Sequence, residues 1–172
     1  MKKIFIFLIC VICLAQSACE RDDICAETTV TTPLLVIDFF DADNPSLEKI
    51  PSNLVIIAEG QEQNEDGEVQ PIIISATSSI SIPLRTDQDI TSFTFTVNES
   101  DDNNDDDENS DIIIFNYTRT EDFVSSACGF RITYDGLEQT FDSADDGPWI
   151  NNVEISNPIV EDETTTHVTI FH

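Results

Sequence analysis

Cysteine residues carry the clearest chemistry in this sequence. Cys19, Cys25 and Cys128 follow an N-terminal apolar segment that itself contains Cys10 and Cys13. A cysteine thiol can form a disulfide, bind a metal or act as a nucleophile, and the redox state of the compartment decides which of these is open to it. The destination of the chain therefore has to be inferred before its cysteines can be assigned a role.

The N-terminus has the organisation of an export signal. Lys2 and Lys3 precede an apolar run from Ile4 to Ala15, and small residues follow it. As a helix this run is about 18 Å long, whereas the hydrocarbon core of a bilayer is ~30 Å thick. We therefore expect residues 1–18 to be a cleaved signal peptide rather than an uncleaved membrane anchor.

The segment Leu14–Cys19 resembles a lipobox, the processing site of bacterial lipoproteins. Ser17, Ala18 and Cys19 fit that pattern, but Gln16 stands where an aliphatic residue is usual. The competing interpretation is ordinary signal-peptidase cleavage after Ser17. We expect Cys19 to be lipidated and to anchor the chain in a lipid bilayer, with residues 19–32 as an acidic tether.

Cysteine parity then leaves two thiols. Once Cys19 carries lipid and the signal peptide is gone, Cys25 and Cys128 remain. Two thiols in an oxidising compartment can pair, and we expect this disulfide. The alternative is a buried free Cys128 and an exposed Cys25, which Cα atoms more than ~7 Å apart would favour.

An acidic stretch, residues 98–110, offers oxygen ligands of the kind that Ca²⁺ prefers. The candidate ligands are Asp101, Asn103, Asp105 and Asp107. An EF-hand loop that began at Asp101 would need Gly and Glu where Asp106 and Ile112 stand. A block of like charges repels itself and stays solvated, so a solvated hairpin loop without metal is the favoured interpretation.

Catalytic motifs are absent from the sequence. It has no Gly-x-Ser-x-Gly, His-Glu-x-x-His or phosphate-binding Gly-rich pattern, and its two histidines are His167 and His172. Strand parity predicts that His167 faces away from Val168 and is exposed. Paired carboxylates could act as acid and base, but among 34 Asp and Glu any pair found by eye is expected by chance. We expect that the protein is not an enzyme and that it binds no cofactor.

Two further features bear on binding. Trp149 could be a sugar-stacking platform, although an anchor in or beside the core is the favoured interpretation. The formal net charge is −27, with seven Lys and Arg. Nucleic-acid binding depends on basic residues that neutralise phosphates. Because this chain is strongly acidic, we expect that it does not bind nucleic acid.

The elements that must position these residues read as strands. The apolar residues are mainly Ile, Val and Phe, which favour strands, and turn residues separate short runs. The runs are 34–40, 54–58, 72–74, 80–84, 93–97, 112–117, 130–134, 137–141, 149–155 and 164–171. Asp135-Gly136 predicts a turn, and residues 121–126 predict a single helical turn. Pro83 predicts that its strand lies at the edge of a sheet or ends there. We expect one all-β domain over residues 33–172, a single β-sandwich of about nine or ten short strands, immunoglobulin-like in the loose sense, or alternatively a closed antiparallel barrel.

Several segments together resemble a family of uncharacterised Bacteroidota lipoproteins, a domain of unknown function. They are Cys19–Cys25, Thr32–Leu35, Ser81–Leu84, Phe123–Gly129 and Trp149–Ile150. The resemblance implies a lipidated Cys19 and supports a Cys25–Cys128 pair, but it implies no activity. Glu20–Asp23 also resembles the acidic signal that sends some such lipoproteins to the cell surface; a solvated tether is the alternative, so the outer membrane is expected and its periplasmic or surface face is left open.

The expected function is that of a non-enzymatic, envelope-anchored module that binds or serves as an accessory subunit. Its partners are the lipid bilayer, through Cys19, and an unidentified envelope protein or glycan. The alternatives are a carbohydrate-binding module of a surface uptake system, with Trp149 as its platform, and a hydrolase with a carboxylate pair.

Overall fold

The described residues form nine β-strands in two sheets. The structure is a computed structural model that describes residues 24–26, 29–60, 70–98, 108–143 and 147–172, and within these ranges it contains strands but no helix. The chain forms two compact units. The smaller comprises Met1–Thr29 and Phe123–Phe130, and the larger comprises Val30–Asp122 and Arg131–His172.

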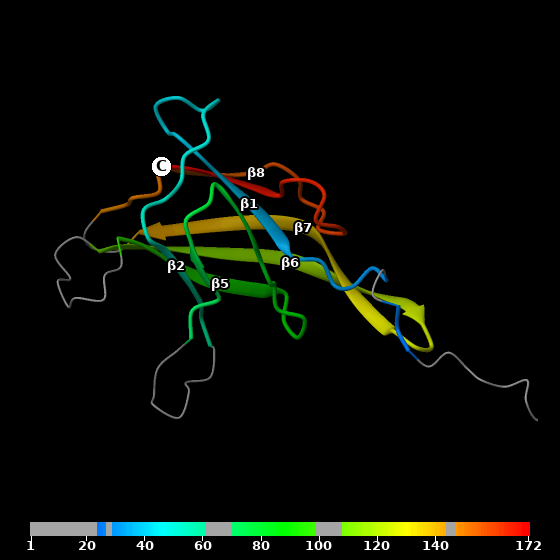
Figure 1. The fold of residues 1–172 in the computed structure, drawn as a ribbon. Coiled ribbons are helices and arrows are strands. Elements are labelled where there is room, and N and C mark those ends of the chain that lie inside the picture. Colours follow the sequence, from blue (N-terminus) through cyan, green and yellow to red (C-terminus); the bar gives the residue numbers. More distant parts are fainter. Residues whose placement is uncertain (1–23, 27–28, 61–69, 99–107, 144–146) are drawn as a thin grey trace, which may run out of the picture. The chain divides into compact units, whose positions relative to one another are not determined.

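One sheet has four strands. Their order is β4 (Ser79–Ile82), β1 (Leu35–Phe40), β9 (Val168–Phe171) and β8 (Asn152–Ile155) (Figure 1). β1 is antiparallel to β4 and parallel to β9, and β8 is antiparallel to β9. Strands from the two ends of the described chain therefore lie beside one another in the middle of this sheet.

The other sheet has five strands. Their order is β3 (Ile73–Ser75), β2 (Leu54–Ala58), β5 (Ile90–Val97), β6 (Asn109–Ser125) and β7 (Gly129–Ser143). β2 is antiparallel to both β3 and β5, and β5 is antiparallel to β6. The described strands thus divide between two sheets instead of closing into one, which confirms the all-β sandwich.

Alternating side chains from both sheets form the core. In β5 the residues Phe93, Phe95 and Val97 are buried, whereas the threonines between them are partly exposed, as the sequence pattern predicts. Ile37 and Phe39 of β1 belong to the same buried cluster. Because successive side chains of a strand point to opposite faces, each sheet contributes one apolar face to this core.

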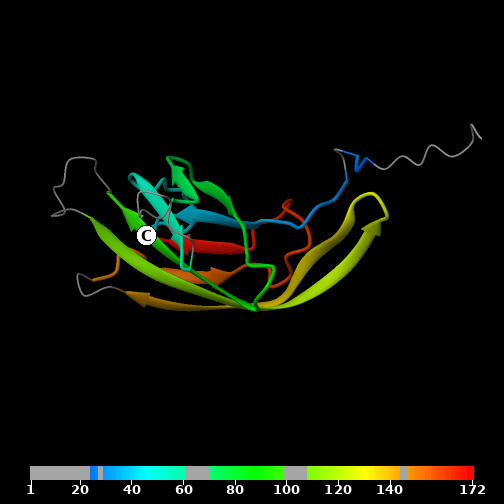
Figure 2. The same ribbon diagram turned by 90° about the horizontal axis from the view of Figure 1, so that it is seen from below.

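Two local predictions are wrong. β6 continues as a strand to Ser125, through the residues predicted to form a helical turn. β7 runs unbroken through Asp135-Gly136, where a turn was predicted, and Figure 2 shows the long β6 and β7 side by side. Gly136 adopts a positive φ of 64°, and Tyr134 forms a bridge with Val160. Glycine in a strand often marks a local irregularity and not its end, and pairing with a distant segment keeps this strand extended.

Two other strand predictions have mixed outcomes. Apolar residues fill nearly all of β1, a pattern typical of a central strand buried on both faces, but within β1 only Leu35, Ile37 and Phe39 are fully buried, and the residues between them are partly exposed. β4 ends at Ile82, just before Pro83, and lies at the edge of its sheet, as predicted. The expected signal peptide, Cys19 and the candidate calcium ligands lie outside the described residues.

Candidate functional site

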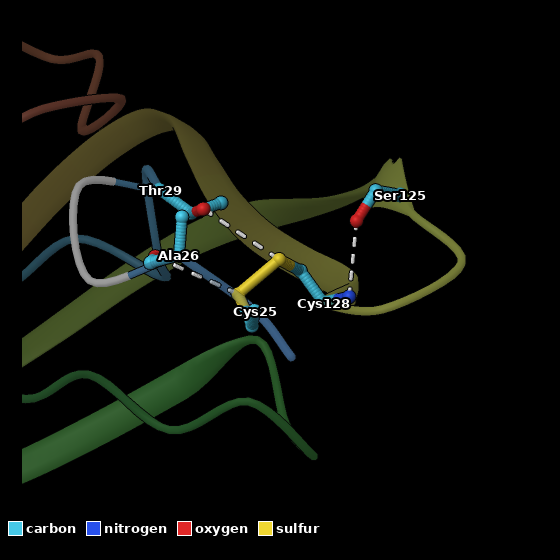
Figure 3. The surroundings of a disulfide bond; sticks show 5 residues. All are labelled: Cys25, Ala26, Thr29, Ser125 and Cys128. Carbon is cyan, nitrogen blue, oxygen red and sulfur yellow. Dashed lines mark hydrogen bonds between the residues drawn. A yellow bond between two sulfur atoms is a disulfide. The ribbon is translucent and has the colours of Figure 1, made fainter. Parts of the chain in front are cut away.

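The smaller unit is organised around a disulfide. Cys25 and Cys128 are bonded, with Cα atoms 4.8 Å apart and a sequence separation of 103 (Figure 3). The Cα distance is typical of a disulfide, and the pairing is the one expected from cysteine parity. The bond fastens the N-terminal segment to the short connection between β6 and β7.

Hydroxyl groups support the half of the disulfide that comes from the hairpin. The backbone amide of Cys128 donates to Ser125 Oγ at 3.0 Å, which closes the turn between β6 and β7. The hydroxyl of Thr29 lies 3.6 Å from Cys128 Sγ, and because a disulfide sulfur carries no proton, Thr29 is the donor. The amide of Thr29 also donates to the carbonyl of Ala26, the residue after Cys25, at 2.9 Å.

Exposed apolar side chains surround this bond in the sequence. Ile24, Phe123 and Phe130 are 82%, 61% and 61% exposed, and we call these three residues the apolar tip. The rings of Phe123 and Phe130 lie 5.3 Å apart, edge to face. Large exposed apolar groups that lie together mark sites of contact with another protein or with a membrane.

Sequence reasoning missed this feature. The alternation of Phe130 with Ile132 and Tyr134 predicts that Phe130 faces the core, yet it is exposed while Tyr134 is buried. Phe130 belongs to the smaller unit and not to the buried cluster. The available signal was the position of both phenylalanines within a few residues of Cys128, at a chain reversal where a strand has little to pack on.

Trp149 is held as an anchor beside the core. Its indole Nε1 donates to the carbonyl of Phe95 at 3.1 Å, and its ring lies edge to face with the ring of His172 at 5.5 Å. The side chain is partly buried and packs against the core cluster. This arrangement favours the interpretation of a core anchor over that of an open platform for a sugar.

A buried carboxylate fixes the backbone at this position. Asp111 of β6 is fully buried, and its Oδ2 accepts from the amides of Trp149 and Ile150 at 2.9 and 2.8 Å. Composition gave no means of telling this aspartate from the acidic stretch just before it. Its position in an apolar strand, two residues before Ile113, was the available signal.

The prediction that His167 is an exposed sheet residue is wrong. The side chain is 1% exposed, and its Nδ1 accepts from the amide of Val36 at 3.0 Å while its own amide donates to the Val36 carbonyl. β9 begins at Val168, so the parity of that strand does not extend to His167. Burial lowers the pKa of this imidazole more than the nearby Asp162 and Glu163 raise it.

His172 is also engaged structurally. Its Nε2 lies 3.2 Å from the carbonyl oxygen of Lys49, to which the ring donates, and its own carbonyl oxygen accepts from Lys49 Nζ at 2.7 Å. Burial lowers the pKa of this imidazole. Both histidines therefore serve as neutral hydrogen-bonding groups in the larger unit.

The larger unit contains an open hollow of about 340 Å³. Its lining includes Ala58, Glu59, Ile72, Leu84, Arg85 and Asp87. The guanidinium of Arg85 makes two hydrogen bonds to the Asp87 carboxylate, at 3.0 and 2.8 Å. These bonds lower the pKa of Asp87, so this carboxylate is held ionised, which is the opposite of what a general acid requires.

A ring of hydrogen bonds stabilises the backbone behind this hollow. The amide of Arg85 donates to Thr91 Oγ1 at 3.0 Å, the Thr91 hydroxyl lies 2.5 Å from Tyr117 Oη, and Tyr117 donates to the carbonyl of Arg85 at 3.0 Å. Tyr134 donates to the carbonyl of Leu84 at 3.2 Å. Burial raises the pKa of both phenols, that of Tyr134 to about 12, so both remain donors.

Two features are absent from the described part of the chain. Its residues include no group of three or more His, Cys, Asp or Glu side chains that could hold a metal ion. They also include no helix long and apolar enough to cross a membrane.

A family model, described as a family of unknown function (DUF6452), matches residues 53–172. The match includes β2 to β9 and Cys128, and it begins after Cys25 and β1. No curated protein and no solved structure matches the chain.

Proposed function

This chain belongs to the family of unknown function (DUF6452), and on that premise we propose that it is an exported, lipid-anchored β-sandwich that acts by binding. Cys19 carries the lipid and holds the domain at the outer membrane. The domain serves as a binding or accessory module and not as an enzyme. Its partner is an envelope protein.

The Cys25–Cys128 disulfide is the observation that carries this proposal. Disulfides persist in oxidising compartments outside the cytoplasm, so the bond supports export. It also uses two of the three cysteines that follow the expected signal peptide, which leaves Cys19 as the remaining thiol. A lipidated Cys19 accounts for all three cysteines without a free reactive thiol on an exported protein.

The larger unit supports binding rather than catalysis through the way its polar groups are used. Asp111, Thr91 and His167 all bond to backbone groups of the fold itself. The charge of Arg85 in the hollow is matched by Asp87. Groups engaged in this way stabilise a scaffold, which leaves recognition to exposed residues.

Mass spectrometry of the protein purified from its native membrane tests the anchor. The expected result is an N-terminal peptide that starts at Cys19 and carries acyl chains, together with a peptide pair joined through Cys25 and Cys128. Cys19→Ser is the variant expected to leave the membrane fraction. A Cys25→Ser/Cys128→Ser double variant is the matched control, because it removes two thiols but keeps the anchor.

An N-terminus at Ala18 with an unmodified Cys19 would refute the anchor. The binding role has its own test, in which the anchored protein is crosslinked in intact cells and its partners are identified. We expect the same envelope protein to be recovered from wild type and from Trp149→Phe, since the indole is an anchor in the fold. Recovery of glycan alone, and its loss in Trp149→Phe, would contradict the proposal.

A further inference from the structure

We propose that the apolar tip inserts into the headgroup region of a zwitterionic lipid bilayer, as a second membrane contact beside the lipid on Cys19. This inference rests on the proposed lipidation of Cys19. It assigns Ile24, Phe123 and Phe130 to membrane contact, and it leaves the larger unit free for a protein partner.

Chain length places the apolar tip at the membrane surface. Cys25 follows Cys19 by six residues, and six residues of fully extended chain span at most about 21 Å. The disulfide then fixes Cys128 next to Cys25, with 4.8 Å between their Cα atoms (Figure 3). The disulfide therefore keeps the end of the β6–β7 hairpin within reach of the bilayer in every conformation of the tether, although Cys128 lies 103 residues after Cys25.

The side chains at this position have the chemistry of a membrane contact. Ile24 precedes Cys25 directly, and Phe123 and Phe130 lie five residues before and two residues after Cys128. Each is more than half exposed. Aromatic and aliphatic side chains on an interfacial segment bury their apolar surface at the boundary between headgroups and acyl chains. A reversible second contact of this kind strengthens the membrane attachment given by a lipid anchor, because the anchor keeps the local concentration of the apolar tip at the membrane high.

Charge selects the kind of bilayer. Glu121 and Asp122 directly precede Phe123. Asp122 Oδ2 lies 3.6 Å from Arg131 Nη2, so the charge of Asp122 is paired. The chain as a whole nevertheless carries a net charge of −27. Anionic headgroups repel acidic residues within a Debye length of about 8 Å at physiological ionic strength. A zwitterionic surface lacks this repulsion, so we commit to phosphatidylcholine or phosphatidylethanolamine headgroups.

Fluorescence quenching in vesicles tests the insertion. Lipidated Phe130→Trp protein is reconstituted into phosphatidylcholine vesicles whose acyl chains carry bromine near the headgroup. Leu47→Trp is the matched control, because Leu47 is 55% exposed and belongs to the larger unit. Trp149 contributes the same background to both. We expect quenching of the tryptophan at position 130 well above that at position 47; equal quenching, or none at position 130, would overturn the inference.

Failure of the anchor and failure of the insertion give different results. Mass spectrometry of the same preparation reports whether Cys19 is acylated. If Cys19 is not acylated, the proposed function fails, and a thiol-reactive lipid can be attached to Cys19, since Cys25 and Cys128 are already bonded. The quenching comparison then still decides the insertion by itself.

A second measurement uses vesicle binding without the anchor. Cys19→Ser protein is compared with the same protein that also carries Phe123→Ser and Phe130→Ser, and with a Leu47→Ser control. Burial of one exposed phenylalanine changes a partition coefficient by about tenfold or more. We expect the double variant to lose most of its binding to phosphatidylcholine vesicles, and we expect added anionic lipid to weaken binding.

Phe123, Phe130 and Leu47 are all exposed, and an unchanged unfolding transition verifies that the fold persists in their variants. Vesicle binding that is unaffected by loss of both phenylalanines contradicts the inference. So does loss of a crosslinked protein partner without any change in vesicle binding, since that result would make the apolar tip a protein contact.

Discussion

The carboxylate of Asp111 accepts a hydrogen bond from the backbone amide of Ile150 at 2.8 Å, across 39 positions of sequence. The same oxygen accepts from the amide of Trp149. β6 thereby fixes the start of the segment that leads into β8, a strand of the other sheet. A buried acidic side chain thus connects the two layers of the sandwich.

We expect Asp111→Ala to lower the free energy of unfolding by about 2–4 kcal/mol, because two backbone amides lose their acceptor. Urea unfolding followed by Trp149 fluorescence measures this change. Asp142→Ala is the matched control, since Asp142 is an exposed aspartate on β7, and its effect is expected to stay within ~0.5 kcal/mol. Equal effects of the two substitutions would rule out the bridging role of Asp111.

Thr91→Val removes one member of the hydrogen-bond ring that also contains Arg85 and Tyr117. The Arg85 amide loses its acceptor, so the expected loss is about 1–3 kcal/mol of unfolding free energy. Thr94→Val is the control on the same strand, where valine is as compatible with β structure as threonine. Thermal unfolding of both variants provides the comparison, and a loss confined to Thr94→Val would contradict the assignment.

Acidification is expected to weaken the fold through His167 and His172. Both have pKa values lowered from 6.5 by burial, so the unfolded chain takes up protons first as the pH falls. Stability is therefore fully present above about pH 6.5 and declines below it until the lowered pKa values are passed. Asp41, Asp87 and Asp162, whose pKa values are lowered from 3.8, affect stability only at still lower pH.

Unfolding of wild type and of a His167→Asn/His172→Asn double variant at several pH values isolates this effect. The comparison is needed because loss of net negative charge on acidification acts in the opposite direction. We expect the double variant to lose less stability than wild type between pH 6.5 and 5. Parallel pH profiles would show that the histidines do not contribute.

Reduction of the Cys25–Cys128 bond is expected to cost about 2–4 kcal/mol of unfolding free energy. The bond closes a long loop, with a sequence separation of 103, and its removal restores freedom to the unfolded chain. Thermal unfolding with and without a phosphine reductant measures the loss. The Cys25→Ser/Cys128→Ser variant should not respond to the reductant, and a response there would assign the effect to something other than this bond.

The sequence predicted those parts of the fold that depend on local periodicity and on counting. The alternation in β5 predicted its buried face, and cysteine parity indicated the pair that the structure contains. Predictions failed where a distant segment decides the local conformation. Asp135-Gly136 is equally compatible with a tight turn and with an irregular strand, and contacts with distant residues, such as the bridge from Tyr134 to Val160, distinguish them.

The candidate site was predictable in its covalent part and not in its surface. Parity pointed to Cys25 and Cys128, but the alternation around Phe130 predicted burial. Periodicity tells which residues share a face and not whether anything covers that face. The prediction for His167 was wrong for a related reason. Its buried side chain bonds to the backbone of Val36, a contact that no sequence pattern predicts.

The parallel pairing of β1 with β9 has a consequence for the order of events in synthesis. β9 lies between β1 and β8, so the four-stranded sheet lacks an interior strand until residues 168–171 are available. Pairing over such separations makes folding slow, because the entropy of closing a long loop must be overcome first. A nascent chain stays open until residues 168–171 are made, so under the export that we propose it would cross the membrane before it becomes compact.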